Sequence, residues 1–407
     1  MYIISSSHDL PDFEYLVGRL QERMDEGIYV GDLSSLHAEL YENQRIMALN
    51  LKNLYGIENP NSSQQVADFF SSIADSNITN ACIRDGKWTT DKKAMVELAM
   101  LGYQEAIDIL AYRKAKKYAE TVKSIMNFTS PVDYRVRPKI SLGKTNRVNY
   151  SEPALINIPK AIVGYIIKPR GDGSKLYSVD IKNQEPWIMI NMLDIKMLKA
   201  ILENGNDLYT EVFKVIFGRE PSKLERQELK VSWNAMTYGA SKKGINELCR
   251  HIDGDKVYDF FNSIPEFKSY RYKCKALANK KVQTVSTYFG TKVTANEYGW
   301  KLQRVLMDIP IQGTGSDILA LLVKHFDDEV ENRGLEELMD IVFTRHDEII
   351  IEVAGRLLVD AGEDKVIDIL MDVFQHRVDD WEPFKVEIKE LGKEDIFRND
   401  VEEEIEA

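Results

Sequence analysis

The feature that most constrains the fold is a pair of adjacent acidic residues between two runs of β-branched residues. Residues 344–353 have the sequence TRHDEIIIEV, and an apolar run, 341–343, precedes them. This pattern predicts a tight hairpin with largely buried arms, and it places Asp347 and Glu348 at the tip. Burying a charge costs several kcal/mol unless the charge is paired or bound to a cation. The acids therefore indicate either an ordinary exposed turn or a cation site.

A second predicted strand also ends at an acid. Residues 175–185, KLYSVDIKNQE, alternate apolar and polar side chains and run on into the apolar segment 186–193. Asp180 can therefore face Asp347 across one sheet. Two such carboxylates repel each other unless cations lie between them. Two divalent ions about 3.5–4 Å apart would satisfy both acids and serve displacement at phosphorus, although Asp180 taken alone could simply cap a turn.

A helix with a polar stripe is predicted over residues 222–239. Ser222 and Glu225 fit the reciprocal capping pattern, and Gly239 offers a stop. Between them, polar side chains recur every four residues: Arg226, Lys230, Asn234 and Tyr238. Four residues turn about 400°, so these side chains form one stripe about 18 Å long. A stripe that is basic at one end and aromatic at the other suits a nucleoside triphosphate, whereas the Arg-Lys pair alone also fits a solvated face.

In this order, these segments resemble the polymerase core of family A DNA polymerases, the group of bacterial polymerase I and phage replicative enzymes. The resemblance covers the chain from about Leu33 to the C-terminus. It implies an α+β right-hand polymerase with an antiparallel palm sheet and helical fingers and thumb. The matching motif residues are Asp180 and Glu185 in the first palm motif, Arg226, Lys230, Tyr238 and Gly239 in the fingers helix, and His346, Asp347 and Glu348 in the second palm motif.

Two further blocks agree with the family pattern. Residues 145–147 (TNR), followed by 151–153 (SEP) and 156–159 (INIP), resemble the segment that grips the template-primer. Residues 304 and 310–317 resemble the helix that contacts the primer terminus and the minor groove. The DNA-binding residues implied by the resemblance are Arg147, Asn157, Arg304, Gln312 and His346.

The resemblance also implies the catalytic roles. Asp180 and Asp347, joined by the backbone carbonyl of Ile181, would hold two Mg²⁺ ions, for which Mn²⁺ could substitute. Lys230 would neutralise phosphate oxygens and donate a proton to the departing group. Glu348 would be a supporting acid.

The implied nucleotide-binding residues are Arg226, Lys230, Glu185, Tyr238, Asn234 and Tyr209. Glu185, hydrogen-bonded to Tyr238, would leave no room for a ribose 2′-hydroxyl, which predicts DNA as the product. The chain departs from the family pattern at three positions: Asn234 replaces an aromatic residue, Tyr209 a histidine and Asp308 an asparagine. Trp233 cannot replace the aromatic group, since one residue along a helix is a rotation of about 100°.

The predicted organisation has an N-terminal extension followed by the parts of a polymerase. The expected parts are 1–31 (extension), 32–150 (thumb and template-primer-binding region), 151–200 (first part of the palm), 201–303 (fingers) and 304–407 (second part of the palm with an acidic tail). Only about 30 residues precede the thumb-like region, whereas a proofreading domain needs well over 100. We therefore expect no intrinsic exonuclease.

The formal net charge of −12 argues only superficially against a DNA partner, because DNA affinity depends on the Lys and Arg that touch phosphates. Basic residues cluster before the palm and are expected to line the duplex path: Arg113, Lys114, Lys116, Lys117, Arg135, Arg137, Lys139, Lys144 and Arg147. Three distant cysteines indicate neither disulfides nor a zinc site. No apolar run is expected to span a membrane, so the predicted location is the cytoplasm of a bacterial or phage-infected cell.

Three functions remain open from the sequence. The first is a DNA polymerase whose partners are a template-primer duplex, deoxynucleoside triphosphates and accessory proteins such as a helicase-primase, a separate exonuclease or a processivity factor. The second is a single-subunit RNA polymerase or primer-making relative, which residues 235–244 also resemble. The third is a non-catalytic DNA-binding replication subunit, which would require the loss of metal ligands that are present here.

Overall fold

The chain forms two compact units in the computed structural model, which describes residues 3–397 except 85, 205, 281–283 and 394. One unit, the sheet unit, comprises residues 1–28, 137–157 and 169–391. The other, the helical unit, comprises 29–136, 158–168 and the chain from 392 onward. The structure is 57% helix and 13% strand, which confirms the predicted α+β class.

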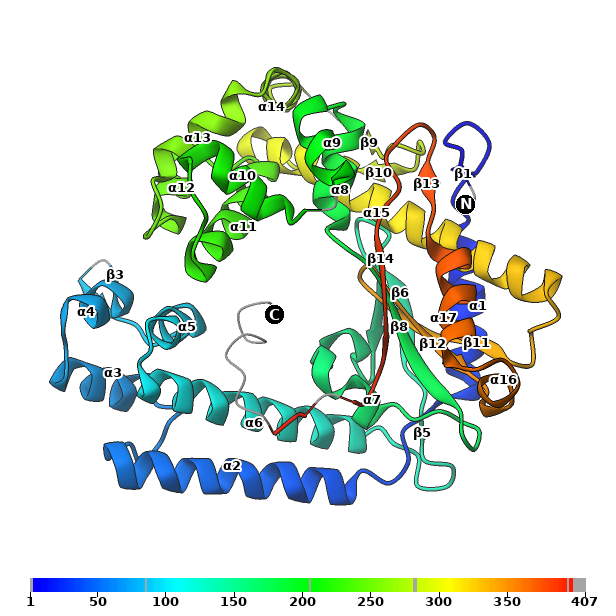
Figure 1. The fold of residues 1–407 in the computed structure, drawn as a ribbon, viewed down its shortest axis with the longest axis horizontal. Helices are drawn as coiled ribbons and strands as arrows, with labels where there is room; N and C mark the ends of the chain where they lie inside the picture. The colour runs from blue at the N-terminus through cyan, green and yellow to red at the C-terminus, as the bar shows by residue number, and fades with distance from the viewer. Residues whose placement is uncertain (1–2, 85, 205, 281–283, 394, 398–407) are drawn as a thin grey trace. The chain divides into compact units, whose positions relative to one another are not determined.

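The sheet unit is built on a four-stranded antiparallel sheet with the order β11-β12-β8-β14 (Figure 1). The strands are β8 (Lys175–Ile181), β11 (Met339–Arg345), β12 (Glu348–Val353) and β14 (Val386–Glu390). The predicted hairpin is confirmed: β11 and β12 are joined by His346 and Asp347, and all six residues of β12 are buried. A β-bulge interrupts the β11–β12 pairing between Ile341 and Phe343.

The second predicted strand is shorter than expected. β8 ends at Ile181, and Asn183 at φ 52° begins a helix, α8 (Gln184–Met192). Glu185 therefore lies in the first turn of a helix and not on a strand. Most of α8 is buried. A short apolar run in the sequence cannot distinguish a buried helix from a buried strand, which explains the difference.

Helices cover the sheet. α15 (Gly299–Asn332) contacts α8, α1 and α17 (Glu363–Phe374), and Figure 1 shows these helices beside the sheet. By length and composition α15 could cross a membrane, so the expectation that no apolar run reaches that length is wrong here. However, 72% of its apolar window is buried inside the protein, which is the property of a core helix.

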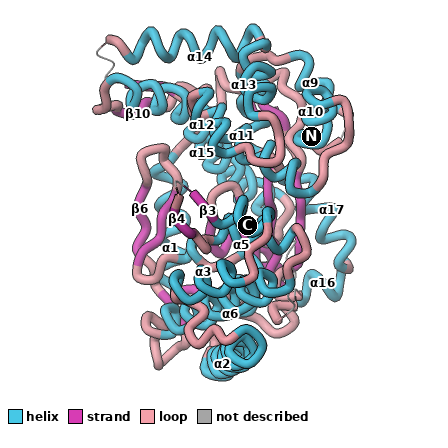
Figure 2. The backbone as a smooth tube through the Cα atoms, turned by 90° about the vertical axis from the view of Figure 1, so that its left-hand side faces the viewer, coloured by secondary structure: helices cyan, strands magenta, loops and turns pink. Residues whose placement is uncertain are grey.

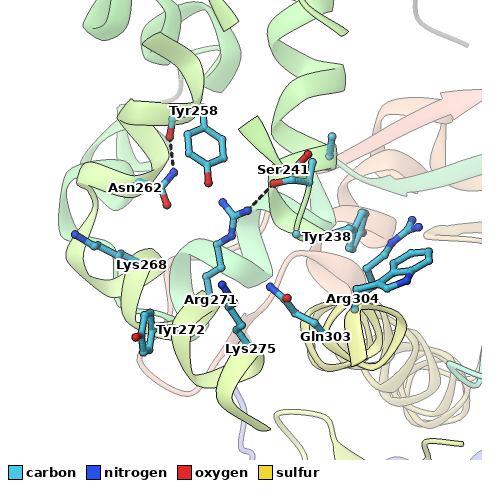
Figure 3. Close-up of a pocket in the computed structure, with 14 residues that line it drawn as sticks. Tyr238, Ser241, Tyr258, Asn262, Lys268, Arg271, Tyr272, Lys275, Gln303 and Arg304 are labelled. Atoms are coloured by element: carbon cyan, nitrogen blue, oxygen red, sulfur yellow. Dashed lines mark hydrogen bonds between the residues drawn. The ribbon is translucent and has the colours of Figure 1, made fainter. Parts of the chain in front are cut away.

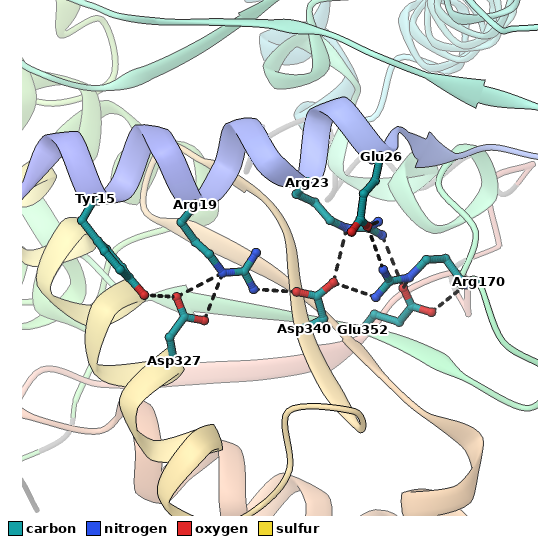
Figure 4. Close-up of polar contacts among 8 residues, drawn as sticks. All are labelled: Tyr15, Arg19, Arg23, Glu26, Arg170, Asp327, Asp340 and Glu352. Carbon is teal, nitrogen blue, oxygen red and sulfur yellow. Dashed lines mark hydrogen bonds and ion pairs between the residues drawn. The ribbon is translucent and has the colours of Figure 1, made fainter.

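The N-terminal segment is part of the sheet unit. α1 (Phe13–Glu26) contacts α15 and β11. Arg19 and Arg23 on α1 form ion pairs with Asp340 of β11 at 2.6 and 3.4 Å. These contacts belong to the ion-pair cluster in Figure 4, whose members are Tyr15, Arg19, Arg23, Glu26, Arg170, Asp327, Asp340 and Glu352.

A group of helices between β8 and α15 carries the predicted polar stripe. They are α9 (Lys196–Glu203), α10 (Leu208–Phe217), α11 (Lys223–Thr237), α12 (Lys242–Leu248), α13 (Gly254–Ser263) and α14 (Pro265–Ala278). The capping box of Ser222 and Glu225 is present at the start of α11. Trp233 is fully buried against Phe261 and Tyr209, so it faces the core, as the helical spacing predicts.

The helical unit has its own core. Its helices are α2 (Ser34–Tyr55), α3 (Ser63–Ser72), α4 (Ser76–Cys82), α5 (Lys92–Met100), α6 (Gln104–Met126) and α7 (Val163–Ile166). Ser62 and Asp91 are the N-caps of α3 and α5, and Gly56 ends α2. Lys114 on α6 is 8% exposed, so the expectation that it lines a duplex path is wrong, whereas Lys117 on the same helix is exposed.

Short elements complete the described fold, as Figure 2 shows by type. They are β1 (Ile3–Ile4), β2 (Ile28–Tyr29), β3 (Ile83–Arg84), β4 (Lys87–Trp88), β5 (Arg135–Val136), β6 (Lys139–Leu142), β7 (Val148–Ser151), η1 (Leu155–Asn157), η2 (Lys160–Ile162), β9 (Thr284–Ser286), β10 (Lys292–Thr294), α16 (Gly355–Ala361) and β13 (Arg377–Val378). Most of the predicted acidic tail lies outside the described residues.

Candidate active site

The structure brings Asp180 and Asp347 together at one end of the sheet. Asp180 is the register partner of Glu348, the residue after Asp347. The N–H of Ile181 donates to the carbonyl oxygen of Asp347 at 3.4 Å. Burial, followed by the negative charge of Asp180, raises the pKa of the Asp347 carboxyl to about 6. The two acids predicted to share a site are thus close enough for the charge of Asp180 to disfavour ionisation of Asp347.

Two residues with left-handed backbone flank these acids. His346, in the hairpin turn, has φ 55°, and Asn183, between β8 and α8, has φ 52°. A non-glycine residue in this region costs on the order of 1–3 kcal/mol, and such residues cluster at functional sites. Sequence reasoning identified neither conformation, because neither position carries the glycine that usually marks one.

Glu348 has a different environment from Asp347. It is 3% exposed, forms an ion pair with Arg345 at 2.7 Å and accepts a hydrogen bond from the Ser178 hydroxyl. Asp347, in contrast, has no ion pair within the part of the chain that the structure describes. This arrangement supports the predicted assignment of Glu348 as a supporting acid, because its charge is already compensated.

The donor set fits a hard divalent cation. Asp180, Asp347 and nearby backbone carbonyls offer oxygen ligands, which Mg²⁺ prefers. Among the described residues, no group of three or more His, Cys, Asp or Glu side chains could hold a metal by itself. Mg²⁺ commonly keeps several waters and uses one or two carboxylates plus substrate phosphates, so two aspartates are a sufficient protein contribution.

Glu185 is the centre of a polar cluster. Its carboxylate accepts hydrogen bonds from Arg147 at 2.6 Å and from the Tyr238 hydroxyl. The Gln312 side-chain amide in turn donates to Tyr238 at 3.4 Å. The predicted Glu185–Tyr238 hydrogen bond is therefore present. The contact with Arg147, from the loop between β6 and β7, was not predicted.

The α11 stripe is turned away from the core. Arg226 and Lys230 are partly exposed and Asn234 is exposed, whereas Leu229 and Trp233 are buried. Sequence reasoning identified these residues but missed the partner of Arg226.

Asp207 is that partner. It accepts two hydrogen bonds from Arg226, at 2.6 and 2.8 Å, and it also caps α10. The Arg226 guanidinium lies 5.6 Å from the centre of the Tyr209 ring. Tyr209 itself is only 3% exposed, which leaves it almost no surface for a nucleotide, in contrast to its predicted role.

A basic and aromatic pocket adjoins Tyr238 (Figure 3). Its volume is about 720 Å³. Its lining includes Arg271, Trp300 and Arg304 together with Lys268 and Lys275. Basic groups interleaved with aromatic rings suit nucleic acid.

Outside this pocket, two of the predicted DNA-binding residues, His346 and Asn157, are exposed.

Comparison with known proteins identifies the family. A family model described as DNA polymerase family A matches residues 31–389. DNA polymerase I from Rhizobium leguminosarum is 26% identical over 317 residues, which cover 72% of this chain and 30% of that protein. DNA polymerase I from Aquifex aeolicus (strain VF5) is 27% identical over 286 residues, which cover 66% and 47%. The chain thus spans less than half the length of these two relatives.

A solved structure shares the fold. The POL domain of Pol1 from M. smegmatis, in complex with DNA primer-template and dNTP, superposes with a TM-score of 0.68. The sequence identity is 21%, and the match covers 93% of this chain and 69% of that chain. At this identity the likeness shows the fold alone.

Proposed function

Since the chain belongs to the family A DNA polymerases, we propose that it is a template-directed DNA polymerase that adds deoxynucleotides to the 3′ end of a primer. The observation that carries this proposal is the meeting of Asp180 and Asp347 at the end of β8 and the tip of the β11–β12 hairpin. The solved relative that holds primer-template and dNTP supports the same substrates.

Each acid has a defined part in the proposed reaction. Asp180 and Asp347, with the carbonyl of Ile181, would hold two Mg²⁺ ions. When bound, such ions activate the attacking hydroxyl and neutralise the charge on the phosphates and the leaving pyrophosphate. Glu348 keeps the hairpin tip in place through Arg345 and Ser178.

The α11 stripe would bind the triphosphate. Lys230 would neutralise phosphate oxygens and donate a proton to the departing pyrophosphate. Arg226 uses its Nε and one terminal nitrogen on Asp207. A guanidinium has five N–H donors in a planar fork that suits phosphate, so we expect Arg226 to contact the phosphates from this position. Tyr209 packs behind Arg226 and supports it without touching the nucleotide.

Glu185 would select the sugar. Its carboxylate is fixed by Arg147 and Tyr238, so it cannot easily move aside for a ribose 2′-hydroxyl. We expect Glu185→Ala to raise ribonucleotide incorporation about tenfold or more, because loss of the fixed carboxylate removes its clash with the 2′-hydroxyl. An unchanged preference between deoxynucleotides and ribonucleotides in this variant would contradict the assignment.

Primer extension with Mg²⁺ tests the proposal. Deoxynucleotides and ribonucleotides should be supplied separately, on DNA and on RNA templates. We expect extension with deoxynucleotides on the DNA template. A clear preference for ribonucleotides would favour the RNA polymerase alternative, and DNA binding without any extension would favour a non-catalytic subunit.

Asn234 should change the discrimination against nucleotides that lack the 3′-hydroxyl. It stands on the exposed face of α11 where an aromatic ring is usual, so stacking on the incoming nucleotide is weaker. Single-turnover incorporation of dideoxynucleotides by the wild type, Asn234→Phe and Asn234→Tyr measures the effect. Equal discrimination against dideoxynucleotides in all three proteins would contradict this role of Asn234.

The remaining assignments belong to the same proposal. The helical unit, residues 29–136, supports a thumb over most of the predicted range 32–150, and the sheet unit would carry the palm and fingers. The three cysteines are buried and form no disulfide, which supports a reducing cytoplasm. We keep the expectations of accessory partners and of no proofreading. Retention of a mismatched primer terminus in the absence of nucleotides would test the latter.

A further inference from the structure

Three polar side chains on α15 occupy one face of the helix. Arg304, Asp308 and Gln312 recur every four residues, so they project in nearly the same direction. All three line a pocket of about 440 Å³ together with Tyr238 and Trp300. Arg304 and Gln312 can donate hydrogen bonds. Asp308, when ionised, can only accept them.

The Asp308 side chain has neither a hydrogen bond nor an ion pair with any residue that the structure describes. Its Oδ1 atom is buried without a hydrogen bond, and within residues 3–397, apart from the gaps named above, Asp308 has no ion pair. Burial, and then the charge of Glu185, raises the pKa of this carboxyl to about 6, which Arg147, Arg304 and Lys144 oppose. It is therefore ionised at neutral to alkaline pH. A partly buried acceptor without a donor is costly, so a ligand that supplies a donor would be favoured.

If the ligand is DNA, the edges of the base pairs indicate which group could donate a hydrogen bond to Asp308. An enzyme that copies any sequence needs contacts that every base pair can satisfy. The minor groove offers such contacts, because adenine N3 and thymine O2 are acceptors for either orientation of an A·T pair. Arg304 and Gln312 suit those acceptors. The one donor in the minor groove is the 2-amino group of guanine, and it is the group that a carboxylate requires.

We propose that Asp308 makes this protein sensitive to the guanine 2-amino group in the base pair that lies against α15. The proposal rests on the polymerase function proposed above. Extension is then faster from a primer end whose pair presents this amino group. An A·T pair leaves the carboxylate facing acceptors only. An asparagine at this position would carry both a donor and an acceptor and would remove the preference.

Base analogues that add or remove only the 2-amino group test the proposal. Inosine replaces guanine opposite cytosine, and 2,6-diaminopurine replaces adenine opposite thymine, at each of the last three pairs and on either strand. Single-turnover incorporation of one fixed next nucleotide is measured. At one of these positions, we expect wild-type extension to fall about tenfold on removal of the amino group and to rise by a similar factor on its addition.

Two variants assign the effect to Asp308. Asp308→Asn should reduce the ratio between amino-bearing and amino-lacking pairs to about twofold or less. Glu297→Gln is the matched control, because Glu297 lines the same pocket but is paired with Lys144. Its ratio should equal that of the wild type.

The outcomes separate this inference from the proposed function. Robust extension with equal rates on all analogues overturns the role of Asp308 and leaves the polymerase proposal intact. A wild-type ratio retained in Asp308→Asn also overturns it. Failure of every primer-template to be extended contradicts the polymerase function itself.

Discussion

The two ends of the β11–β12 hairpin place acidic residues in opposite electrostatic settings. At the end away from the turn, Asp340 and Glu352 are register partners. Arg170 contacts both at 2.6 and 2.9 Å, and Arg23 lies 3.4 and 3.5 Å from them (Figure 4). Like charges directly opposite each other destabilise a sheet, so these cations make the pairing tolerable.

At the turn, the protein supplies less compensation. Glu348 and Asp180 are again register partners, and Glu348 has Arg345. Asp347, however, has a raised pKa and no ion pair among the described residues. One hairpin therefore has an end stabilised by its own arginines and an end whose charge is left for a ligand to neutralise. The proposed metal site is therefore marked by an acid whose charge no neighbouring cation of the described chain balances, as well as by the presence of acids.

Replacing one carboxylate at each end of the hairpin by its amide should show the largest difference in activity. Asp347→Asn should reduce primer extension at least about 1,000-fold, or about 4 kcal/mol, because a metal ligand is lost. It should not lower the free energy of unfolding, since a repelled charge disappears. Asp340→Asn is the matched control: it should destabilise the fold while the folded fraction keeps most of its activity. Equal losses of activity by the two folded variants would contradict the assignment of the metal site to the turn end of the hairpin.

Removing the buried arginine should have the next largest effect. Arg23 is 2% exposed, and Arg23→Ala would leave Asp340 and Glu352 with fewer cations. We expect the free energy of unfolding to fall by about 3 kcal/mol, measured by urea denaturation. Arg45→Ala, at an exposed pair with Glu42, is the control and should change it by less than about 1 kcal/mol. A loss no larger than that of the control would show that the cluster is not stabilising.

Asp317, a buried acid away from the hairpin, tests how an uncompensated carboxylate changes stability with pH. Asp317 is fully buried, and burial raises its pKa to about 6, although Thr291 donates to it at 2.8 Å. Because the folded pKa exceeds the unfolded value, its contribution to stability is present below about pH 4 and is lost as the pH rises through about 6. Asp317→Asn should therefore raise the free energy of unfolding at pH 8 by about 1–2 kcal/mol.

Unfolding measured at pH 5 and pH 8 provides the check. The gain in Asp317→Asn should shrink at the lower pH, where the wild-type carboxyl is largely protonated in the folded state. A gain that is the same at both pH values would exclude ionisation as its cause.

The smallest effect is expected from a change that keeps the charge. Arg170→Lys retains a cation, but a lysine cannot match the planar fork that contacts Asp340 and Glu352 together. We expect a loss of about 1 kcal/mol by urea denaturation, with Arg170→Met as the more damaging comparison. Greater damage from lysine than from methionine would show that a cation alone does not stabilise this site.

Local patterns predicted the elements that carry the site. The β-branched arms of the 341–351 hairpin and the capping box at Ser222 act over a few residues, so sequence alone identified both. The same local logic misjudged residues 184–185, which were predicted to continue the strand but begin the buried helix α8.

Several contacts between distant segments were not predicted. Asp207 meets Arg226, and Arg147 meets Glu185, only because helices and loops pack in three dimensions. The pairing of α1 with Asp340 has the same origin, and for this reason residues 1–31 carried so little information as a sequence. The charged residue types identified the candidate site residues. Which of these charges have an ion-pair partner depends on the fold.

The central position of β8 has a consequence for synthesis. This strand ends at Ile181, yet its sheet neighbours β12 and β14 begin only at Glu348 and Val386. At about 5–20 residues per second, the ribosome needs on the order of ten seconds or more to supply them. Throughout that interval both edges of an apolar strand await their partners, so we expect a chaperone that shields nascent chains to improve the yield of this protein.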